Sequence, residues 1–159
     1  MRRLLVILGA TAVFAAGCTP NAASVAASGG AALAPGAAVQ RVDVNLGGNP
    51  PLISTLGTLA GYAPNPSTVA VGTVIVFHNS ESFPHTASAI AGATFPAASP
   101  FTIAALQPSG ARLSDAGWSS GQLQPGAASQ PLTADTPGIY LYGCFFHYGT
   151  PMRGAIVVQ

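Results

Sequence analysis

Charged residues are scarce in this chain. It has five arginines, no lysine and four acidic residues among 159 residues. Binding of nucleic acid needs a basic patch that neutralises phosphates, so the composition excludes a nucleic-acid partner. The same lack of charge argues against strong electrostatic steering of any other partner. A docking surface on this protein should therefore consist mainly of apolar and uncharged polar side chains.

The few carboxylates also bear on enzymatic function. The four acidic residues are scattered over the chain and offer no carboxylate pair for general acid–base catalysis. A thiol nucleophile is disfavoured too, because His147 follows Cys144 by three residues, a spacing that suits chelation better than base catalysis. We therefore expect the protein not to be an enzyme.

An apolar run occurs at the start of the chain, but it is short. A basic start at residues 1–3 precedes apolar residues 4–16, too few for a membrane span, and Gly17 and Cys18 end the run. This pattern predicts a signal peptide over residues 1–18 and export to the periplasm or cell envelope. Residues 15–18 resemble a bacterial lipobox. We expect lipidation at Cys18 as the only membrane attachment, with soluble periplasmic export as the alternative.

Cysteine is nearly absent, since the chain has only Cys18 and Cys144. If Cys18 is lipidated or removed with the signal, no disulfide can form within the mature chain. Cys144 is then an unpaired thiol in an oxidising compartment, where an exposed thiol is a liability. Ligation of a metal is a reason to keep it.

Glycine and proline, by contrast, are abundant, with 19 and 14 residues. Residues 19–38 are Ala, Ser, Gly and Pro with hardly a large apolar residue, so we expect a low-complexity, flexible linker there. Residues 39–159 suit one domain, expected to be a monomer. In it Gly and Pro separate short apolar runs, which is typical of an all-β sandwich or barrel.

Six strands are predicted in this domain. Residues 73–79 have large apolar residues on both faces, which indicates a central, covered strand. Residues 87–118 have the least regular pattern, and we expect one or two short strands and a turn of helix there. The predicted strands are 39–46, 68–71, 73–79, 131–134, 138–144 and 155–159.

Four possible metal ligands stand out. Cys144, His147 and Met152 lie within nine residues, and His85 lies 59 residues before Cys144. Two imidazoles, one thiolate and a weak axial thioether form the ligand set of a type-1 copper site, since sulfur favours Cu(I) and imidazole suits both oxidation states. A structural zinc site has no use for a thioether. The sequence therefore predicts one copper ion.

The sequence around these ligands resembles the plastocyanin-like cupredoxins. Their C-terminal pattern, a strand, Cys-x2-His-x4-Met, Gly and a strand, matches residues 137–158. Residues 74–79 followed by Phe83-Pro84-His85 resemble the strand and loop that carry the first His ligand, and residues 119–126 resemble the family's Ser-Gly-x-Leu-x-Pro-Gly turn. The resemblance covers residues 62–159 and implies a Greek-key sandwich of the cupredoxin type.

The resemblance also implies a role for each ligand. Cys144 would be the main equatorial ligand, bound as a thiolate, and Met152 the weak axial one. His85 and His147 would complete the equatorial set, with the ring edge of His147 at the surface, where redox partner proteins dock on an apolar patch. Thr86 stands where the family often has an Asn that fastens the two ligand loops.

His78 is the remaining histidine. The alternation of the strand places it on the face away from Phe77, and no ligand-loop motif surrounds it. We expect a strand residue and not a ligand.

Taken together, these features predict a type-1 copper protein that carries single electrons between redox partners at the bacterial cell envelope. A copper-binding or copper-delivery protein without electron transfer is the alternative, although its single thiolate offers fewer soft ligands than such a role usually uses. A structural envelope domain that has lost its metal is a third possibility, disfavoured by the intact ligand set.

Overall fold

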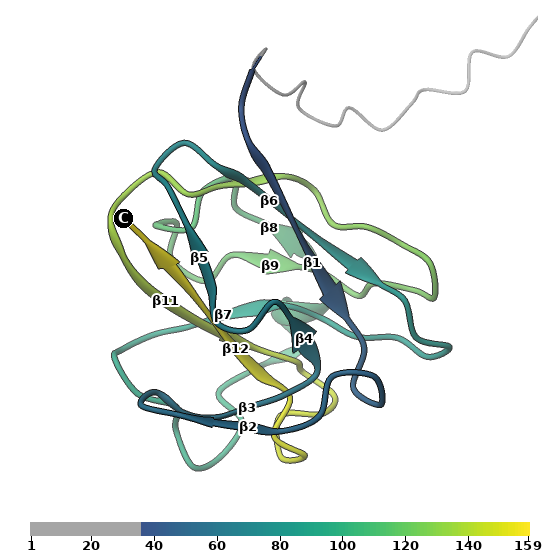
Figure 1. Ribbon diagram of the computed structural model, residues 1–159. Helices are drawn as coiled ribbons and strands as arrows, with labels where there is room; N and C mark the ends of the chain where they lie inside the picture. Colours follow the sequence, from purple (N-terminus) through teal and green to yellow (C-terminus); the bar gives the residue numbers. More distant parts are fainter. Residues whose placement is uncertain (1–35) are drawn as a thin grey trace, which may run out of the picture.

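Two β-sheets lie face to face in the described part of the chain, residues 36–159 of a computed structural model (Figure 1). The predicted signal peptide, Cys18 and the predicted linker up to residue 35 lie outside the described residues. Among the described residues no helix has the length and apolar character needed to cross a membrane.

The first sheet has four strands and holds the central strand predicted from the sequence. Strand β6 pairs in parallel with β1 along its whole length and antiparallel with β10 on its other side. In spatial order the strands are β10 (Leu132–Thr133), β6 (Val74–Asn79), β1 (Val39–Val44) and β4 (Tyr62–Ala63).

The second sheet has six strands, and a separate hairpin is formed by β2 (Leu52–Ser54) and β3 (Gly57–Leu59). Most neighbours in both sheets are not consecutive in the chain, as expected for a Greek-key sandwich. In order, the second sheet is β5 (Ser67–Val69), β12 (Arg153–Val158), β11 (Gly138–Gly143), β7 (Ser88–Ile90), β9 (Ser119–Ser120) and β8 (Pro108–Ser109).

The core fills the space between the two sheets. Along β6, Ile75 and Phe77 are completely buried and face residues of the second sheet. Phe77 stacks on Trp118 at 5.9 Å between ring centroids and meets the edge of Tyr142 at 5.1 Å. Burial of these large rings contributes to the apolar stabilisation of the fold. Cys144, which follows β11, belongs to the same cluster of buried core residues.

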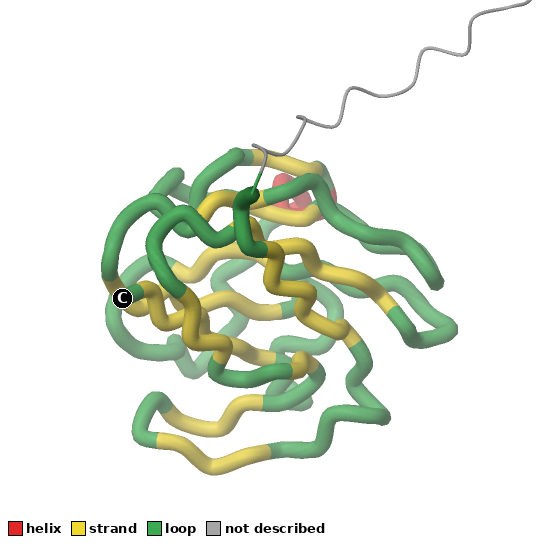
Figure 2. The backbone as a smooth tube through the Cα atoms, turned by 45° about the horizontal axis from the view of Figure 1, so that its top comes forward, coloured by secondary structure: helices red, strands yellow, loops and turns green. Residues whose placement is uncertain are grey.

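The all-β fold predicted from the sequence is confirmed, and each of the six predicted strands has a counterpart within a few residues. The irregular region also agrees with expectation, because it contains β7, β8 and a short 3-10 helix η1 (Ile103–Leu106), the only helix in residues 36–159 (Figure 2). The strands β2, β3, β4 and β9 were missed. Each has only two or three residues, which is too short for a periodic signal.

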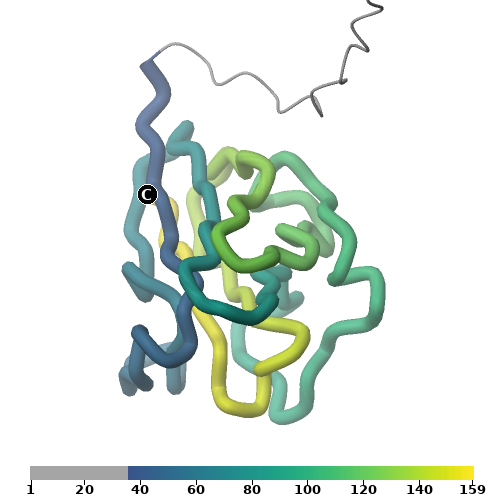
Figure 3. Tube along the Cα trace, turned by 90° about the vertical axis from the view of Figure 1, so that its right-hand side faces the viewer, coloured from purple at the N-terminus to yellow at the C-terminus, as the bar shows by residue number. Residues whose placement is uncertain are grey.

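The arrangement of strands brings three loops to one end of the molecule. Because β1 and β6 are parallel, with Val44 opposite Asn79, the loops that follow them leave the sheet side by side. The β11–β12 loop, residues 144–152, lies at the same end, opposite to the end where residue 36 enters (Figures 1 and 3).

Candidate metal centre

Three of the predicted ligands converge at this end of the sandwich. The Cys144 Sγ lies 3.7 Å from the Nδ1 of both His85 and His147, and the two Nδ1 atoms are 3.2 Å apart. Within residues 36–159 this is the only cluster of His, Cys and acidic side chains arranged to hold a metal ion. Cys144 and His85 are completely buried, and His147 is partly exposed.

The backbone of His85 is fixed by the turn predicted from the resemblance. His85 and Leu123 form a short bridge, in which the Leu123 N–H donates to the His85 carbonyl at 2.8 Å and the His85 N–H to the Leu123 carbonyl at 3.1 Å. The buried Asn79 amide at the end of β6 donates to the carbonyls of Leu123 and Phe83. Both ends of the loop that carries His85 are thereby held.

The β11–β12 loop positions Cys144, His147 and Met152. The N–H of Cys144 donates to the Met152 carbonyl at 3.1 Å, which closes the loop as a continuation of the β11–β12 ladder. The His147 carbonyl accepts bonds from the N–H groups of Thr150 and Met152. The nine residues from Cys144 to Met152 therefore form a closed loop, which holds the three predicted ligands that it contains close together.

Thr86 fastens the two ligand loops together. Its hydroxyl accepts a hydrogen bond from the Phe145 N–H at 2.9 Å, and its own N–H donates to the Cys144 Sγ at 3.4 Å. The Ser88 hydroxyl donates to the Thr86 hydroxyl at 3.2 Å and holds it in place. A threonine thus provides the contact that the resemblance assigns to an asparagine.

Met152 is completely buried, and its side chain lies against Gly61 in the loop between β3 and β4. Gly61 has φ +77, and a Cβ at this position would lie 2.5 Å from the Met152 Cγ and 3.2 Å from its Sδ. Only glycine combines this left-handed conformation with the space that the thioether needs. The role of Gly61 was not predicted, since nothing in its local sequence points to the distant Met152.

Burial affects the protonation of Cys144 and His85. It raises the pKa of the Cys144 thiol, although the hydrogen bond from the Thr86 N–H acts in the opposite direction. Burial also lowers the pKa of His85, in spite of the Glu81 carboxylate beside it. Without a metal, burial therefore favours a neutral Cys144 thiol and a neutral His85 imidazole. A bound cation would displace the thiol proton.

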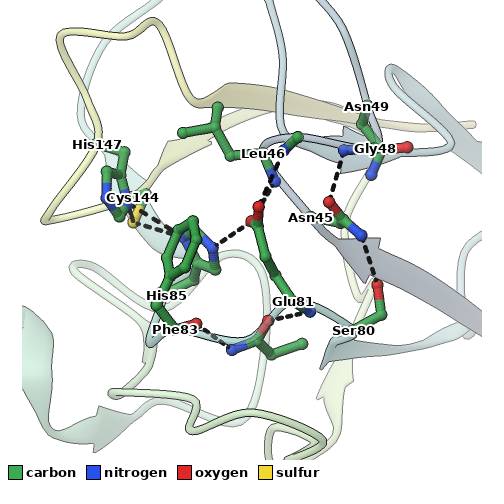
Figure 4. Close-up of polar contacts among 12 residues, drawn as sticks. Asn45, Leu46, Gly48, Asn49, Ser80, Glu81, Phe83, His85, Cys144 and His147 are labelled. Atoms are coloured by element: carbon green, nitrogen blue, oxygen red, sulfur yellow. Dashed lines mark hydrogen bonds and ion pairs between the residues drawn. The ribbon is translucent and has the colours of Figure 1, made fainter.

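The side chain of Glu81 contacts the far edge of His85. The His85 Nε2 lies 2.8 Å from the Glu81 Oε2 (Figure 4). A carboxylate only accepts hydrogen bonds, and the opposite ring nitrogen, Nδ1, faces Cys144 and His147. This contact was not predicted from the sequence, in which Glu81 is one of only four acidic residues. Its position four residues before a predicted ligand was the available signal.

These donors fit copper. Metal–nitrogen and metal–sulfur bonds of about 2.0–2.3 Å allow donor atoms 3.2 to 3.7 Å apart to contact one ion. Two imidazoles and a cysteine sulfur, with the Met152 thioether at the end of the same loop as Cys144 and His147, match the His₂Cys set with axial Met that is typical of blue-copper proteins. The arrangement is type-1 copper-like. His78, as expected, lies on β6 outside this cluster.

The surface over the centre is apolar. Phe83, Pro84, Phe146 and His147 line a shallow hollow of about 430 Å³. Phe83 and Phe146 are 40% and 41% exposed, which is unusual for phenylalanine. The partly exposed His147 ring is thus the ligand that connects the centre with this hollow.

Comparison with known proteins finds similarity at the level of structure. No protein-family model and no curated protein sequence matches the chain. Solved structures similar to it include a purple cupredoxin, an amicyanin and a plastocyanin, which share 21 to 23% of aligned residues with it.

The purple cupredoxin, from Nitrosopumilus maritimus, has a TM-score of 0.48, 21% identity and coverage of 75% of this chain and 98% of that one. A reduced amicyanin variant has a TM-score of 0.44, 23% identity and coverage of 79% and 85%. A variant plastocyanin of fern has a TM-score of 0.45, 21% identity and coverage of 76% and 100%.

The first prediction concerns Thr86. In Thr86→Val the Phe145 N–H loses its acceptor at nearly unchanged side-chain volume, so we expect the free energy of unfolding of the apo-protein to fall by about 1–3 kcal/mol. Thr86→Ser keeps the oxygen and should lose much less. Denaturant unfolding of both variants measures this. Equal losses would contradict the role of the hydroxyl.

The second prediction concerns Gly61. Gly61→Ala should displace the Met152 side chain and destabilise the protein, whereas Gly72→Ala has a similar φ of +88 but open space around its Cβ. Both variants carry a backbone strain of about 1–3 kcal/mol, so their difference isolates the contact with Met152.

The methyl NMR signal of Met152, the only methionine besides Met1, reports the displacement. We expect it to shift in Gly61→Ala and to stay in place in Gly72→Ala. An unchanged signal in both would mean that Gly61 does not position the thioether.

Proposed function

We propose that the protein is a type-1 copper protein that carries single electrons between redox partners at the bacterial cell envelope. The observation that carries this proposal is the buried triangle of one thiol and two imidazole nitrogens, 3.2 to 3.7 Å apart. Copper bound there supplies reversible one-electron chemistry.

The chain's own residues would act mainly by holding the ligands still. His85 is fixed at its backbone by Leu123, and the β11–β12 loop is closed between Cys144 and Met152. Thr86 ties the two segments together. Ligands held in this way move little when the charge of the centre changes, which favours fast electron transfer. Burial of Cys144 and His85 also keeps water away from them.

The hollow around His147 is the proposed docking surface for redox partners. It is lined by apolar side chains and His147, and the chain has too few charges for a strongly charged recognition surface. An apolar patch of this kind allows brief contact with the His147 edge, through which electrons would pass.

Export supports the same function. The N-terminal pattern predicts a signal peptide and lipidation at Cys18. Strand β1 enters the sandwich at the end opposite to the β11–β12 loop (Figure 3). An anchor on that side would leave the proposed docking surface free to meet partners.

Copper binding is the third prediction. Residues 19–159, mixed with Cu(II), should turn intensely blue, and ascorbate should bleach the colour reversibly because the thiolate–copper bond gives the absorption and the centre cycles by one electron. In Cys144→Ser the blue band should be lost, whereas His78→Gln, which changes a histidine outside the cluster, should keep it.

The outcomes separate the candidates. Copper that binds without a blue band that bleaches reversibly would favour storage or delivery of copper over electron transfer. No binding at all would favour a structural domain. A blue band that survives Cys144→Ser would rule out the assigned centre.

The fourth prediction tests the docking surface. Electron self-exchange between oxidised and reduced copies requires two copper centres to approach through their exposed ligands. Phe146→Ser should slow this exchange about tenfold or more, because burial of a phenylalanine contributes about 1.5–3 kcal/mol.

The exchange rate is measured from NMR line widths of mixed samples. Ile103→Ser is the matched control, because Ile103 is 79% exposed and lies on the 3-10 helix outside the hollow. An equal effect of both substitutions, at unchanged absorption spectra, would argue against docking at His147.

A further inference from the structure

Glu81 is an acidic side chain whose carboxylate is surrounded by donors. Its Oε2 accepts from the Leu46 N–H at 2.7 Å, and its Oε1 accepts from the Gly47 N–H at 3.1 Å. The third partner is the His85 Nε2, 2.8 Å from Oε2. The side chain is only 14% exposed. A carboxylate this enclosed is held in one orientation, which points it at the metal centre (Figure 4).

The parallel pairing of β1 with β6 creates this arrangement. Val44 lies opposite Asn79, so the segment after β1, which carries Leu46 and Gly47, runs beside the segment after β6. The Asn79 side-chain oxygen accepts from the Glu81 N–H at 2.9 Å and turns the chain there. The position of Glu81 is therefore set by the fold of the first sheet and does not depend on a metal.

The carboxylate also keeps its negative charge. The Leu46 and Gly47 N–H groups and the His85 Nε2 all lie at its oxygens, and hydrogen bonds of this kind favour the charged form of a carboxylate. Among residues 36–159 no arginine side chain lies within ion-pair distance of the carboxylate, and its neighbour His85 carries no charge when it is protonated on Nε2 alone. A full negative charge therefore lies on the far side of a ligand imidazole.

We propose that Glu81 is the positioning residue of the metal centre, which fixes the Nε2–H tautomer of His85 and favours the more positive oxidation state of the bound ion. This inference rests on the proposed function. The tautomer follows from hydrogen bonding, since His85 can donate only from Nε2 to Glu81 and must then present Nδ1 to the metal. Partners of this kind orient a ligand imidazole and raise its basicity.

The charge acts on the reduction potential. The higher oxidation state has one more positive charge, so an anion next to its ligand stabilises it more than the lower state. Such an electrostatic contribution is large because the contact is shielded from water. Removal of the charge should therefore weaken Cu(II) binding more than Cu(I) binding and raise the potential.

The fifth prediction uses Glu81→Gln, which keeps the size of the side chain. The three groups around the carboxylate are all hydrogen-bond donors. The glutamine NH₂ is also a donor, so it must face at least one of them and that hydrogen bond is lost. We expect Cu(II) affinity to fall 10–100-fold. For each tenfold loss of Cu(II) relative to Cu(I), the potential rises by about 59 mV.

Asp135→Asn is the matched control. The Asp135 carboxylate also accepts from a backbone N–H and a hydroxyl, both of Ser114. It precedes β11, whereas Cys144 follows the other end of this strand. The substitution removes the same charge from the chain without touching the centre, so affinity and potential should stay unchanged. Glu81→Asp keeps the charge and should retain most of the wild-type potential.

A measurement on the wild-type apo-protein needs no variant. At a pH above about 8, where imidazoles are neutral, ¹H–¹⁵N correlation spectra of the rings should show His85 protonated on Nε2. Protonation on Nδ1 would overturn the proposal, and so would a Glu81→Gln protein with wild-type Cu(II) affinity and potential. These results differ from failure of the proposed function, in which the wild-type protein itself binds no copper.

Discussion

The pairing of β7 with β11 is the constraint on which the metal centre depends. In this ladder Ser88 lies opposite Gly143, so the residues just before β7 meet those just after β11. His85 precedes Ser88 by three residues, and Cys144 follows Gly143 directly. Ligands 59 residues apart in sequence are thus brought together by the register of two strands. A shift of one residue would turn the side chains to the other face.

Beyond the end of the ladder, side chains replace backbone pairs. The Thr86 hydroxyl accepts from the Phe145 N–H where another ladder bond would otherwise form, and Thr86 also donates its N–H to the Cys144 Sγ. The loops can therefore diverge around the ligands without leaving buried polar groups unpaired. The stability of the sheet and the geometry of the centre depend on the same few hydrogen bonds.

The sequence alone predicted the elements with a local signature. Strand β6 was recognised by large apolar residues on both faces, and the ligands by their types and spacing. Gly61 and Glu81 were missed because their roles arise from tertiary contacts. The partners of Glu81 in the loop after β1 are 34 and 35 residues away, and no local pattern encodes such a contact. Thr86 stands where the resemblance led us to expect asparagine, and its hydroxyl joins the two ligand loops through the Phe145 N–H.

The scarcity of charge has a consequence for how the centre is tuned. One of only four acidic residues, Glu81, is largely enclosed, where a carboxylate is costly unless hydrogen bonds compensate it. The Leu46 and Gly47 N–H groups provide this compensation independently of His85. The surface around His147, by contrast, is apolar. The negative charge of Glu81, next to His85, is largely enclosed and is therefore little screened by salt. The surface around His147 has too little charge to steer the association of a partner. The charge beside His85 and the apolar hollow at His147 are thus provided by different residues on different sides of the ligands.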